Sequence, residues 1–542
     1  MSSSTDDVDA VIVGGGQGGI YTAYRFVQDG RSVIGFDGGS NFGGVWCHNR
    51  YPGARIDSDS VDYCFQFSAE LYRGWHWPER YADADALYRY LNYAADHLDV
   101  RQLFRFNTWV REANWSSDDK RWHVTTDQGD RVRSRFLVMC SGVLSEPKHL
   151  VFPGVARFKG EWLRTSRWPE GEVDLRGKRV GIIGTGSSGV QAVPEIAKQA
   201  EHLWVFQRSP HYAIPAQNRP TEPGLQEAIA DDLDERRSEA FHMGGPSDAA
   251  ASNRLRARRE PARPAASYSR SEQLELLEEQ WEYGGHGMSY LFADEATNPE
   301  SNEIVAAFLR MKTHDRLKSR ELADQMCPQY PIGTKRLILD IGYYEAFTQD
   351  NVSLVNVVND PLVEITESGI RTVASHYPVD VLIFAIGFDC FAGALQSAGI
   401  RNEEGGTPTD VWADGPRTVF GLMTPGFPNL FHPTNVGSPS VLGNSMIQHE
   451  FFGDWMAECI SYIEKTNRST IDASSSAAEQ WMHTVDQYAQ QILPIRRSQN
   501  QYMVHVNPDG TRYFKPFCAG MGEYVPKVLG ATQRDYEGFH FS

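Results

Sequence analysis

The chain has 542 residues, which is too long for a single hydrophobic core and predicts about two or three domains. Its formal net charge of −18 disfavours nucleic acid as a partner, because a phosphate polymer would be repelled. The densest basic run, at residues 254–263, is short and rich in Ala and Pro, which is typical of a solvated loop.

Cysteine and histidine usage bounds the chemistry further. The 7 cysteines include no C-x-x-C pair, which predicts free thiols and a reducing, cytoplasmic location. The 16 histidines form no H-E-x-x-H motif and no cluster at ligand spacing, so no bound metal is expected. No signal-peptide pattern is present, and no apolar run approaches the roughly 20 residues that span a bilayer, so no membrane partner is expected.

The first folded segment carries a nucleotide-binding motif. A strand-length apolar run meets Gly14-x-Gly16-x-x-Gly19 and passes into a helical pattern. A second strand then ends at Asp37, where the dinucleotide fold places a carboxylate to bind ribose hydroxyls. Strand, glycines, helix, strand and acid together predict a Rossmann-like unit for FAD or NAD.

Residues 43–57 follow closely and combine a glycine pair, a Tyr-Pro-Gly turn and an isolated carboxylate. Glycines let the backbone approach a flat ligand where a Cβ would collide. Trp46 and Tyr51 offer planar apolar surface, and Asp57 places a carboxylate beside it. This stretch predicts the lining of a redox site.

A second glycine motif, Gly184-x-Gly186-x-x-Gly189, again follows a strand and precedes a helical pattern. After its next strand, the position that Asp37 holds in the first unit is taken by Arg208. An arginine there can pair with a 2′-phosphate, which a carboxylate would repel, so this unit is expected to bind NADP(H). The duplication predicts an α/β protein with two Rossmann-like dinucleotide-binding domains.

The order of these patterns predicts the domain boundaries. Residues 1–143 form the first segment of an FAD-binding domain, and residues 151–386 form an NADP-binding domain. Within the latter, residues 221–330 turn helical and polar without β alternation, which predicts a helical insertion. Residues 387–542 are expected to return to the first domain, because neither N-terminal segment alone has enough strands for a full sheet.

The stretch at 43–57 resembles the short fingerprint of Baeyer–Villiger monooxygenases, (A/G)-G-x-W-x-x-x-x-(F/Y)-P-(G/M)-x-x-x-D, at every fixed position. Segments at 281–285, 333–336 and 426–431 also look like that family's, and the resemblance covers nearly the whole chain. The matching fingerprint residues are Gly43, Gly44, Trp46, Tyr51, Pro52, Gly53 and Asp57.

The resemblance implies FAD held by the N- and C-terminal segments, NADPH held by the middle, and a ketone and O2 as substrates. One oxygen atom is then inserted beside the carbonyl, through a peroxide anion at flavin C4a, to give an ester or lactone. Arg336 matches the family's catalytic arginine, a permanent cation that stabilises that anion, and Asp57 matches the carboxylate that orients it. Lys335 and Arg208 match the pair that grips the 2′-phosphate.

Together, motifs and resemblance give one set of expected site residues. Asp57 and Arg336 are expected to be catalytic. The expected cofactor-binding residues are Gly14, Gly16, Gly19, Asp37, Gly44, Val45, Trp46, Asp57, Tyr63, Gly184, Thr185, Gly186, Ser187, Ser188, Gly189, Arg208, Ser209 and Lys335.

Four departures from the family pattern accompany these matches. Arg164 replaces the histidine of the long fingerprint F-x-G-x-x-x-H-x-x-x-W-P, and Ile386 replaces the threonine of A-T-G. Asn435-Val436 replaces G-P, and Gln501 replaces a tryptophan that contacts the nicotinamide nucleotide in relatives. An unusual substrate, or poorer coupling with peroxide leakage, is the hypothesis that follows.

Other functions compete with ketone oxygenation. The same intermediate could deliver oxygen to nitrogen or sulfur, although Asp57 and Arg336 favour the ketone reaction. A non-oxygenating FAD/NADPH reductase of the disulfide-reducing type would need a cysteine pair beside the flavin, and Cys47 has no partner at suitable spacing. A non-catalytic flavin-binding module is the remaining alternative.

Overall fold

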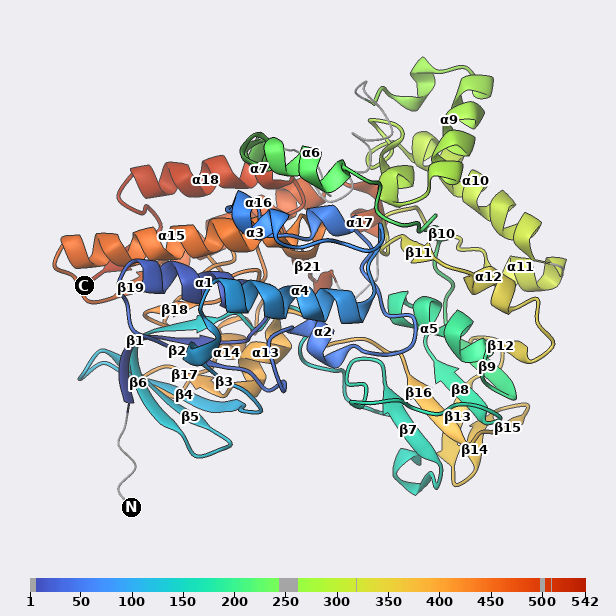
Figure 1. Cartoon of the computed structure of the whole chain (residues 1–542), viewed down its shortest axis with the longest axis horizontal. Coiled ribbons are helices and arrows are strands. Elements are labelled where there is room, and N and C mark those ends of the chain that lie inside the picture. Colours follow the sequence, from blue (N-terminus) through green and yellow to red (C-terminus); the bar gives the residue numbers. More distant parts are fainter. Residues whose placement is uncertain (1–5, 243–261, 318, 498–502, 508) are drawn as a thin grey trace.

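The computed structural model describes residues 6–242, 262–317, 319–497, 503–507 and 509–542. Gln501 and most of the basic run at 254–263 therefore lie outside the described residues. Two α/β units lie side by side, and a lobe of helices stands above the second of them (Figure 1). Among the described helices, none combines the length and the apolar character needed to cross a bilayer.

The larger sheet is assembled from both ends of the chain. Its order is β17-β4-β5-β6-β1-β2-β3, with β18 paired to β6. The first of its strands, β1, is apolar in its second half, where Ala10, Val11 and Ile12 have no exposed surface. Its strands are β1 (Asp6–Val13), β2 (Val33–Phe36), β3 (Phe104–Arg105), β4 (Val110–Ser116), β5 (Arg121–Thr126), β6 (Arg131–Met139), β17 (Ile400–Arg401) and β18 (Leu430–Phe431).

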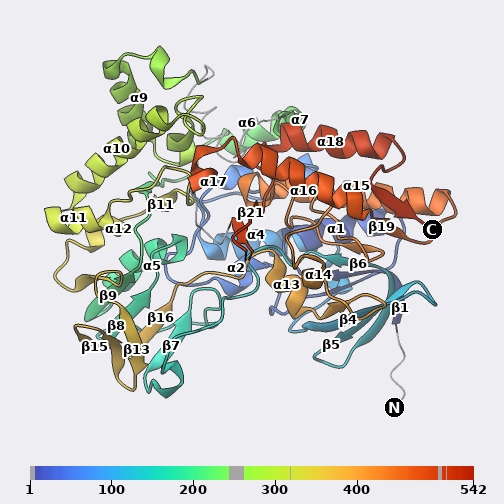
Figure 2. The same ribbon diagram turned by 180° about the vertical axis from the view of Figure 1, so that it is seen from behind.

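Helices from both chain ends cover this sheet. Between β1 and β2 runs α1 (Gln17–Gln28), which packs against α15 (Ser445–Lys465) from the C-terminal segment. In both views α15, α16 (Ser475–Ala489) and α18 (Met521–Gln533) lie on the same side of the sheet (Figures 1 and 2). Smaller elements of this unit are α2 (Val45–His48), α3 (Ala69–Arg73), α4 (Ala84–His97), α13 (Ala392–Ser397), α14 (Pro408–Val411), α17 (Leu493–Arg497), and the strand pairs β19 (Ile471–Ala473) with β22 (Phe539–Phe541) and β20 (Val504–Val506) with β21 (Arg512–Phe514).

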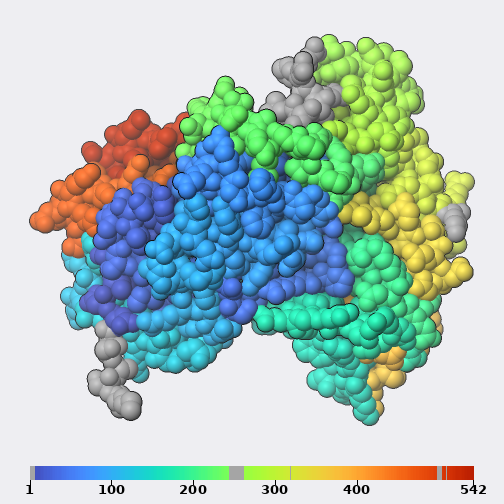
Figure 3. All heavy atoms as spheres, viewed as in Figure 1, coloured from blue at the N-terminus to red at the C-terminus, as the bar shows by residue number. Residues whose placement is uncertain are grey.

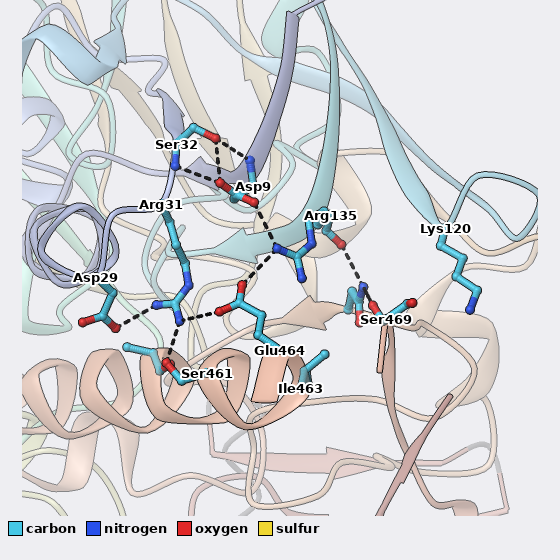
Figure 4. A network of polar contacts seen from close by, with 12 residues as sticks. Asp9, Asp29, Arg31, Ser32, Lys120, Arg135, Ser461, Ile463, Glu464 and Ser469 are labelled. Carbon is cyan, nitrogen blue, oxygen red and sulfur yellow. Dashed lines mark hydrogen bonds and ion pairs between the residues drawn. The ribbon is translucent and has the colours of Figure 1, made fainter. Parts of the chain in front are cut away.

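A network of charges fastens α15 to the first segment (Figure 4). Arg135 Nη1 donates to Asp9 Oδ1 at 3.1 Å and to Glu464 Oε1 at 3.0 Å. Arg31 Nη2 donates to Ser461 Oγ at 2.7 Å and to Glu464 Oε2 at 3.4 Å. The C-terminal segment thus adds both strands and ion pairs to the unit that begins the chain.

The second unit has a fully parallel sheet of order β12-β9-β8-β16-β7. Its strands are β7 (Glu161–Arg164), β8 (Arg179–Ile183), β9 (His202–Gln207), β12 (Val352–Asn356) and β16 (Val381–Phe384), and α5 (Ser187–Ala197) connects β8 to β9. A small antiparallel sheet of β13 (Leu362–Thr366), β14 (Gly369–Thr372) and β15 (His376–Pro378) precedes β16. This small sheet was not expected from the sequence.

A lobe of helices extends from the second unit (Figure 1). It leaves and re-enters the second unit through β10 (Ala213–Pro215) and β11 (Ile338–Asp340), which pair in parallel. Its helices are α6 (Leu225–Asp231), α7 (Leu233–His242), α9 (Arg270–Tyr283), α10 (Pro299–Arg316) and α11 (Arg320–Met326), and α12 (Tyr343–Ala346) follows β11. Because α7 packs against α18, the lobe also contacts the first unit.

Candidate active site

In both glycine motifs, the first and third glycines lie where a side chain would collide with a backbone carbonyl oxygen. A Cβ on Gly14 (φ +111°) would lie 2.4 Å from the Cys140 carbonyl oxygen, and one on Gly184 (φ +112°) 2.4 Å from the Ala385 carbonyl oxygen. A Cβ on the third glycine of each motif would lie only 1.8 Å and 2.1 Å, respectively, from the carbonyl oxygen of the first. Only glycine fits at these positions, as the fingerprint of dinucleotide-binding folds requires.

Both motifs open onto a helix whose N-terminus has no side-chain cap. Gly16 and Gly186 are the N-cap residues of α1 and α5, and neither helix start has a side-chain cap hydrogen bond. First-turn N–H groups and the helix dipole together suit an anionic group such as a pyrophosphate. In α5, Ser187 and Ser188 add hydroxyls to that first turn. Each loop therefore fits the pyrophosphate of a dinucleotide.

At the end of β2, the Asp37 carboxylate is fixed by backbone donors. Gly15 N donates to its Oδ2 at 2.5 Å and Gly39 N donates to its Oδ1 at 2.6 Å. The side chain is buried. Held in this way beside the first glycine loop, the carboxylate lies where it could accept hydrogen bonds from a ribose.

The corresponding position of the second unit gathers cations instead. Lys335 Nζ donates to Ser209 Oγ at 2.6 Å, and Thr185 Oγ1 donates to the Ser209 carbonyl at 3.2 Å. Burial and the neighbouring charge of Arg208 lower the pKa of Lys335 to about 8. Two cations close enough to repel each other are suited to sharing an anion, which fits a 2′-phosphate.

Sequence reasoning missed His211, which lies beside this cation cluster. Burial, followed by the charge of Lys335, lowers the pKa of His211 to about 3. Its Nδ1 is buried and has no hydrogen-bond partner within the described chain. The only signal for His211 in the sequence was its position two residues after Ser209, an expected cofactor-binding residue.

The fingerprint residues lie directly against the first glycine loop. A Cβ on Gly44 (φ +52°) would lie 3.0 Å from Gly16 Cα, so the two backbones touch. Val45 begins α2, and Trp46 Nε1 donates to the Tyr63 hydroxyl at 2.9 Å. Burial raises the pKa of Tyr63 to about 12, so its hydroxyl stays neutral.

The middle of the fingerprint forms the seam between the two units. Tyr51 OH donates to Gln191 Oε1 at 2.7 Å, and Gln191 Nε2 donates to the Arg55 carbonyl at 2.9 Å. A Cβ on Gly53 (φ +81°) would lie 2.3 Å from the Gln191 carbonyl oxygen. The surfaces of the first segment and of the second unit are accordingly continuous (Figure 3).

Asp57 and Arg336 meet across this seam. Arg336 Nη2 donates to Asp57 Oδ1 at 2.9 Å, Arg336 Nε donates to Asp57 Oδ2, and Arg336 Nη1 donates to the Val441 carbonyl at 3.4 Å. The pair is bidentate, the geometry that fixes a guanidinium best. Both side chains keep partial exposure, 29% for Asp57 and 34% for Arg336, so the pair is accessible.

Two neighbours keep the Asp57 carboxylate charged. Burial opposes its ionisation, but the charge of Arg336 and then His286 hold its pKa well below the usual range. His286 Nε2 lies 3.7 Å from Asp57 Oδ2. His286 was not among the site residues expected from the sequence, and the preceding Gly284-Gly285 pair was the available signal.

The departures from the family pattern fall on several parts of the fold. Arg164 ends β7, with its guanidinium carbon 5.6 Å from the Trp162 ring centroid. Asn435 is buried, and its Oδ1 accepts a hydrogen bond from Val436 N at 2.7 Å. Ile386 follows β16 and is half-buried. Gln501 lies outside the described residues.

All 7 cysteines are free and buried. Within the described ranges, no group of three or more His, Cys, Asp or Glu residues is arranged to hold a metal ion.

Comparison with known proteins agrees with this geometry. The family model "Flavin-binding monooxygenase-like" matches residues 8–223. A Baeyer–Villiger monooxygenase of Pseudooceanicola batsensis is 34% identical over 98% of this chain and 95% of that protein. A phenazine N-monooxygenase of Lysobacter antibioticus is 32% identical over 98% of this chain and 96% of that protein.

Among solved structures, that of OTEMO in complex with FAD and NADP superposes with a TM-score of 0.92. It is 32% identical, and the match covers 99% of this chain and 100% of that one. The fold and the site thus define a flavin-dependent monooxygenase with two dinucleotide-binding units. The chain belongs to the Baeyer–Villiger monooxygenases, which convert ketones to esters or lactones with FAD and NADPH.

Proposed function

We propose that Asp57 and Arg336 form the catalytic centre at which oxygen is inserted beside a ketone carbonyl. The observation that carries this proposal is the bidentate ion pair between a carboxylate of the first unit and a guanidinium of the second. A site split in this way is complete only while the two units are docked, so chemistry is tied to a closed arrangement of both nucleotide sites.

In this proposal Arg336 provides a positive charge, and Asp57 orients it. When bound, NADPH would supply the two electrons and FAD would pass them to O2 and so activate it. Arg336 cannot lose its proton near neutral pH, so it offers a permanent positive charge to negative charge that develops in the reaction. Asp57 accepts two hydrogen bonds from Arg336 and fixes the direction of the guanidinium. Asp57 is ionised but already committed to Arg336, which suits an orienting role better than a base.

The nucleotide contacts follow from the two loops. The N-terminus of α1 and the Asp37 carboxylate would hold the pyrophosphate and a ribose of FAD. Trp46 and Tyr63 lie beside this loop and would border the flavin. In the second unit, Arg208, Ser209 and Lys335 would hold the 2′-phosphate of NADPH.

The partners and location proposed here are those of a small-molecule enzyme. The organic substrate is a ketone, and O2 is the co-substrate. Seven buried free thiols support a reducing, cytoplasmic location.

Isotope labelling tests the proposal. Purified enzyme with FAD and NADPH is incubated under ¹⁸O2 with a panel of cyclic, linear, aromatic and polycyclic ketones. We expect an ester or lactone that carries one labelled oxygen atom, with NADPH consumed in equal amount. NADPH oxidation that yields only hydrogen peroxide across the whole panel would contradict the proposal.

A second candidate is oxygen transfer to nitrogen, which the similarity to a phenazine N-monooxygenase favours. In that case the phenazine or a tertiary amine in the same labelling assay would give an N-oxide, and ketones would be returned unchanged. Asp57 and Arg336 support the ketone reaction, because an electrophilic oxygen donor has no use for a fixed cation that stabilises an anion.

A further inference from the structure

The loop between α9 and α10 brings a third residue to the Asp57–Arg336 pair. Its turn is made by Gly284 (φ +74°) and Gly285 (φ +82°), and His286 follows as the first residue of a short 3-10 helix, His286–Tyr290. A Cβ on Gly285 would lie 2.4 Å from the Tyr81 hydroxyl. The two glycines therefore let the helical lobe press its backbone onto the first unit.

His286 is buried at this contact, with 8% of its surface exposed. Its Nε2 lies 3.7 Å from Asp57 Oδ2, slightly beyond hydrogen-bond distance. That nitrogen is buried and has no hydrogen-bond partner in the described part of the chain. A buried polar atom without a partner is costly, and here it points at the carboxylate that orients Arg336.

The charges around the loop decide which form of His286 is present. Burial lowers its pKa below the usual value, and the charge of Arg336 lowers it further, whereas Asp57 and Asp59 act in the opposite direction. The imidazole is therefore neutral near pH 7 and has one N–H to donate. The titratable and charged side chains that face the loop are Asp57, Asp59, Arg80, Tyr81, Tyr283 and Arg336.

We propose that His286 is a positioning residue: its neutral imidazole donates the Nε2 proton to Asp57 Oδ2 and holds the carboxylate in the orientation that keeps Arg336 bidentate. The inference rests on the proposed function and adds to it. Asp57 comes from the first unit, Arg336 from the second and His286 from the helical lobe. The centre is then complete only when all three parts are docked.

Protonation of His286 sets an acid limit to this arrangement. An imidazolium would bind Asp57 by a charge-assisted hydrogen bond and compete with Arg336 for the carboxylate. Arg336 would lose its bidentate contact, and the coupling of NADPH oxidation to oxygen insertion would fall. Since the pKa of His286 lies below its ordinary value of 6.5, the midpoint of this loss lies below that pH.

Three variants separate positioning from packing. His286→Leu removes the N–H and His286→Gln restores one. His123→Gln serves as the matched control, because His123 is 47% exposed and pairs only with the surface Asp119 in the described structure. The ketone is the best-converted member of the panel, and kcat, KM, product formed per NADPH and bound FAD are measured from pH 5 to 8.

We expect kcat and coupling of His286→Leu to fall about tenfold with KM within about twofold, since one hydrogen bond to a charged group is lost. His286→Gln recovers most of the activity at pH 7.5 and lacks the acid limb of the wild type. Unchanged kcat and coupling in His286→Leu would overturn the proposal, and so would an acid limb retained in His286→Gln.

A titration without substrate distinguishes failure of this inference from failure of the proposed function. The His286 imidazole resonance is assigned by its absence from His286→Gln in histidine-labelled holoenzyme. Asp57→Asn is expected to lower the pKa of that resonance, because the Asp57 carboxylate favours the imidazolium. A pKa that does not respond to Asp57→Asn would refute the contact, whatever the enzyme converts.

Discussion

The two dinucleotide units share the backbone geometry of their glycine loops. They differ in the charge of the residue that follows the second strand. In both, a Cβ on the first glycine would lie 2.4 Å from the carbonyl oxygen of a neighbouring strand end, and neither helix start has a side-chain cap. After the second strand, however, the first unit presents Asp37 held by two backbone N–H groups, and the second presents Arg208 beside Lys335. We infer that the scaffold recognises a pyrophosphate in general and that single charges at the strand ends select the nucleotide.

The glycine loops that the two units share should tolerate substitution least. We expect Gly14→Val to abolish FAD binding and most soluble expression, because the new side chain meets the Cys140 carbonyl at a φ that disfavours L residues. Gly30 is the control: it also has positive φ (+78°) but has nothing within 4 Å of an added Cβ. Gly30→Ala should retain its FAD, measured by absorbance after gel filtration. Equal FAD retention by Gly14→Val would contradict the steric account.

Substitution of the charged residues that differ between the two units should alter nucleotide selectivity and leave folding intact. Removing the cations with Arg208→Ala and Lys335→Ala should each raise the KM for NADPH by about ten- to a hundredfold, because a phosphate loses a charge-assisted hydrogen bond. The KM for NADH should change by less than about threefold. Steady-state flavin reduction with both nucleotides checks this, and a parallel loss for NADH would contradict the assignment of the 2′-phosphate site.

The lowered pKa of Lys335 makes the same selectivity depend on pH. Its ammonium is charged below about pH 8 and loses its proton as the pH rises through that value. The affinity for NADP⁺ should therefore be full below pH 8 and decline above it, with a slope approaching about one log unit per pH unit. Isothermal titration from pH 6.5 to 9.5 measures this, with Lys335→Met as the variant that should be flat. A wild-type affinity that rises above pH 8 would refute the role of Lys335.

Substitution at the seam between the two units should have the smallest effect, and we expect it on stability. Tyr51→Phe removes one partly buried hydrogen bond to Gln191 and should destabilise the docked arrangement by about 1 kcal/mol. Thermal unfolding of Tyr51→Phe, Gln191→Ala and the double variant measures the coupling between the two side chains. Strictly additive effects would indicate that this bond does not hold the units together.

Much of the candidate site could be predicted from the sequence because its signals are local. Both glycine motifs, Asp37 and Arg208 follow from spacing along a single βαβ unit, and Lys335-Arg336 stands in a short matching segment. The expected helical lobe also follows from local periodicity. In each case the residues that define the feature are neighbours in the chain.

What the sequence did not reveal depends on contacts between distant segments. Gln191 reaches Tyr51 across the seam, and the approach of His286 to Asp57 requires the lobe to dock on the first unit. The small sheet of β13 to β15 was missed because its strands are short, although the turn at Gly369 marks it: a Cβ there would lie 2.0 Å from the Tyr377 carbonyl oxygen.

The Asp57–Arg336 pair carries the central claim, and Asp57→Ala tests it most directly. Asp57 lies outside the glycine loop, so the variant should keep its FAD and its reduction by NADPH. Ester or lactone formed per NADPH should fall by about ten- to a hundredfold, with hydrogen peroxide making up the difference, because Arg336 loses its orientation. Full coupled oxygenation by Asp57→Ala would contradict the account.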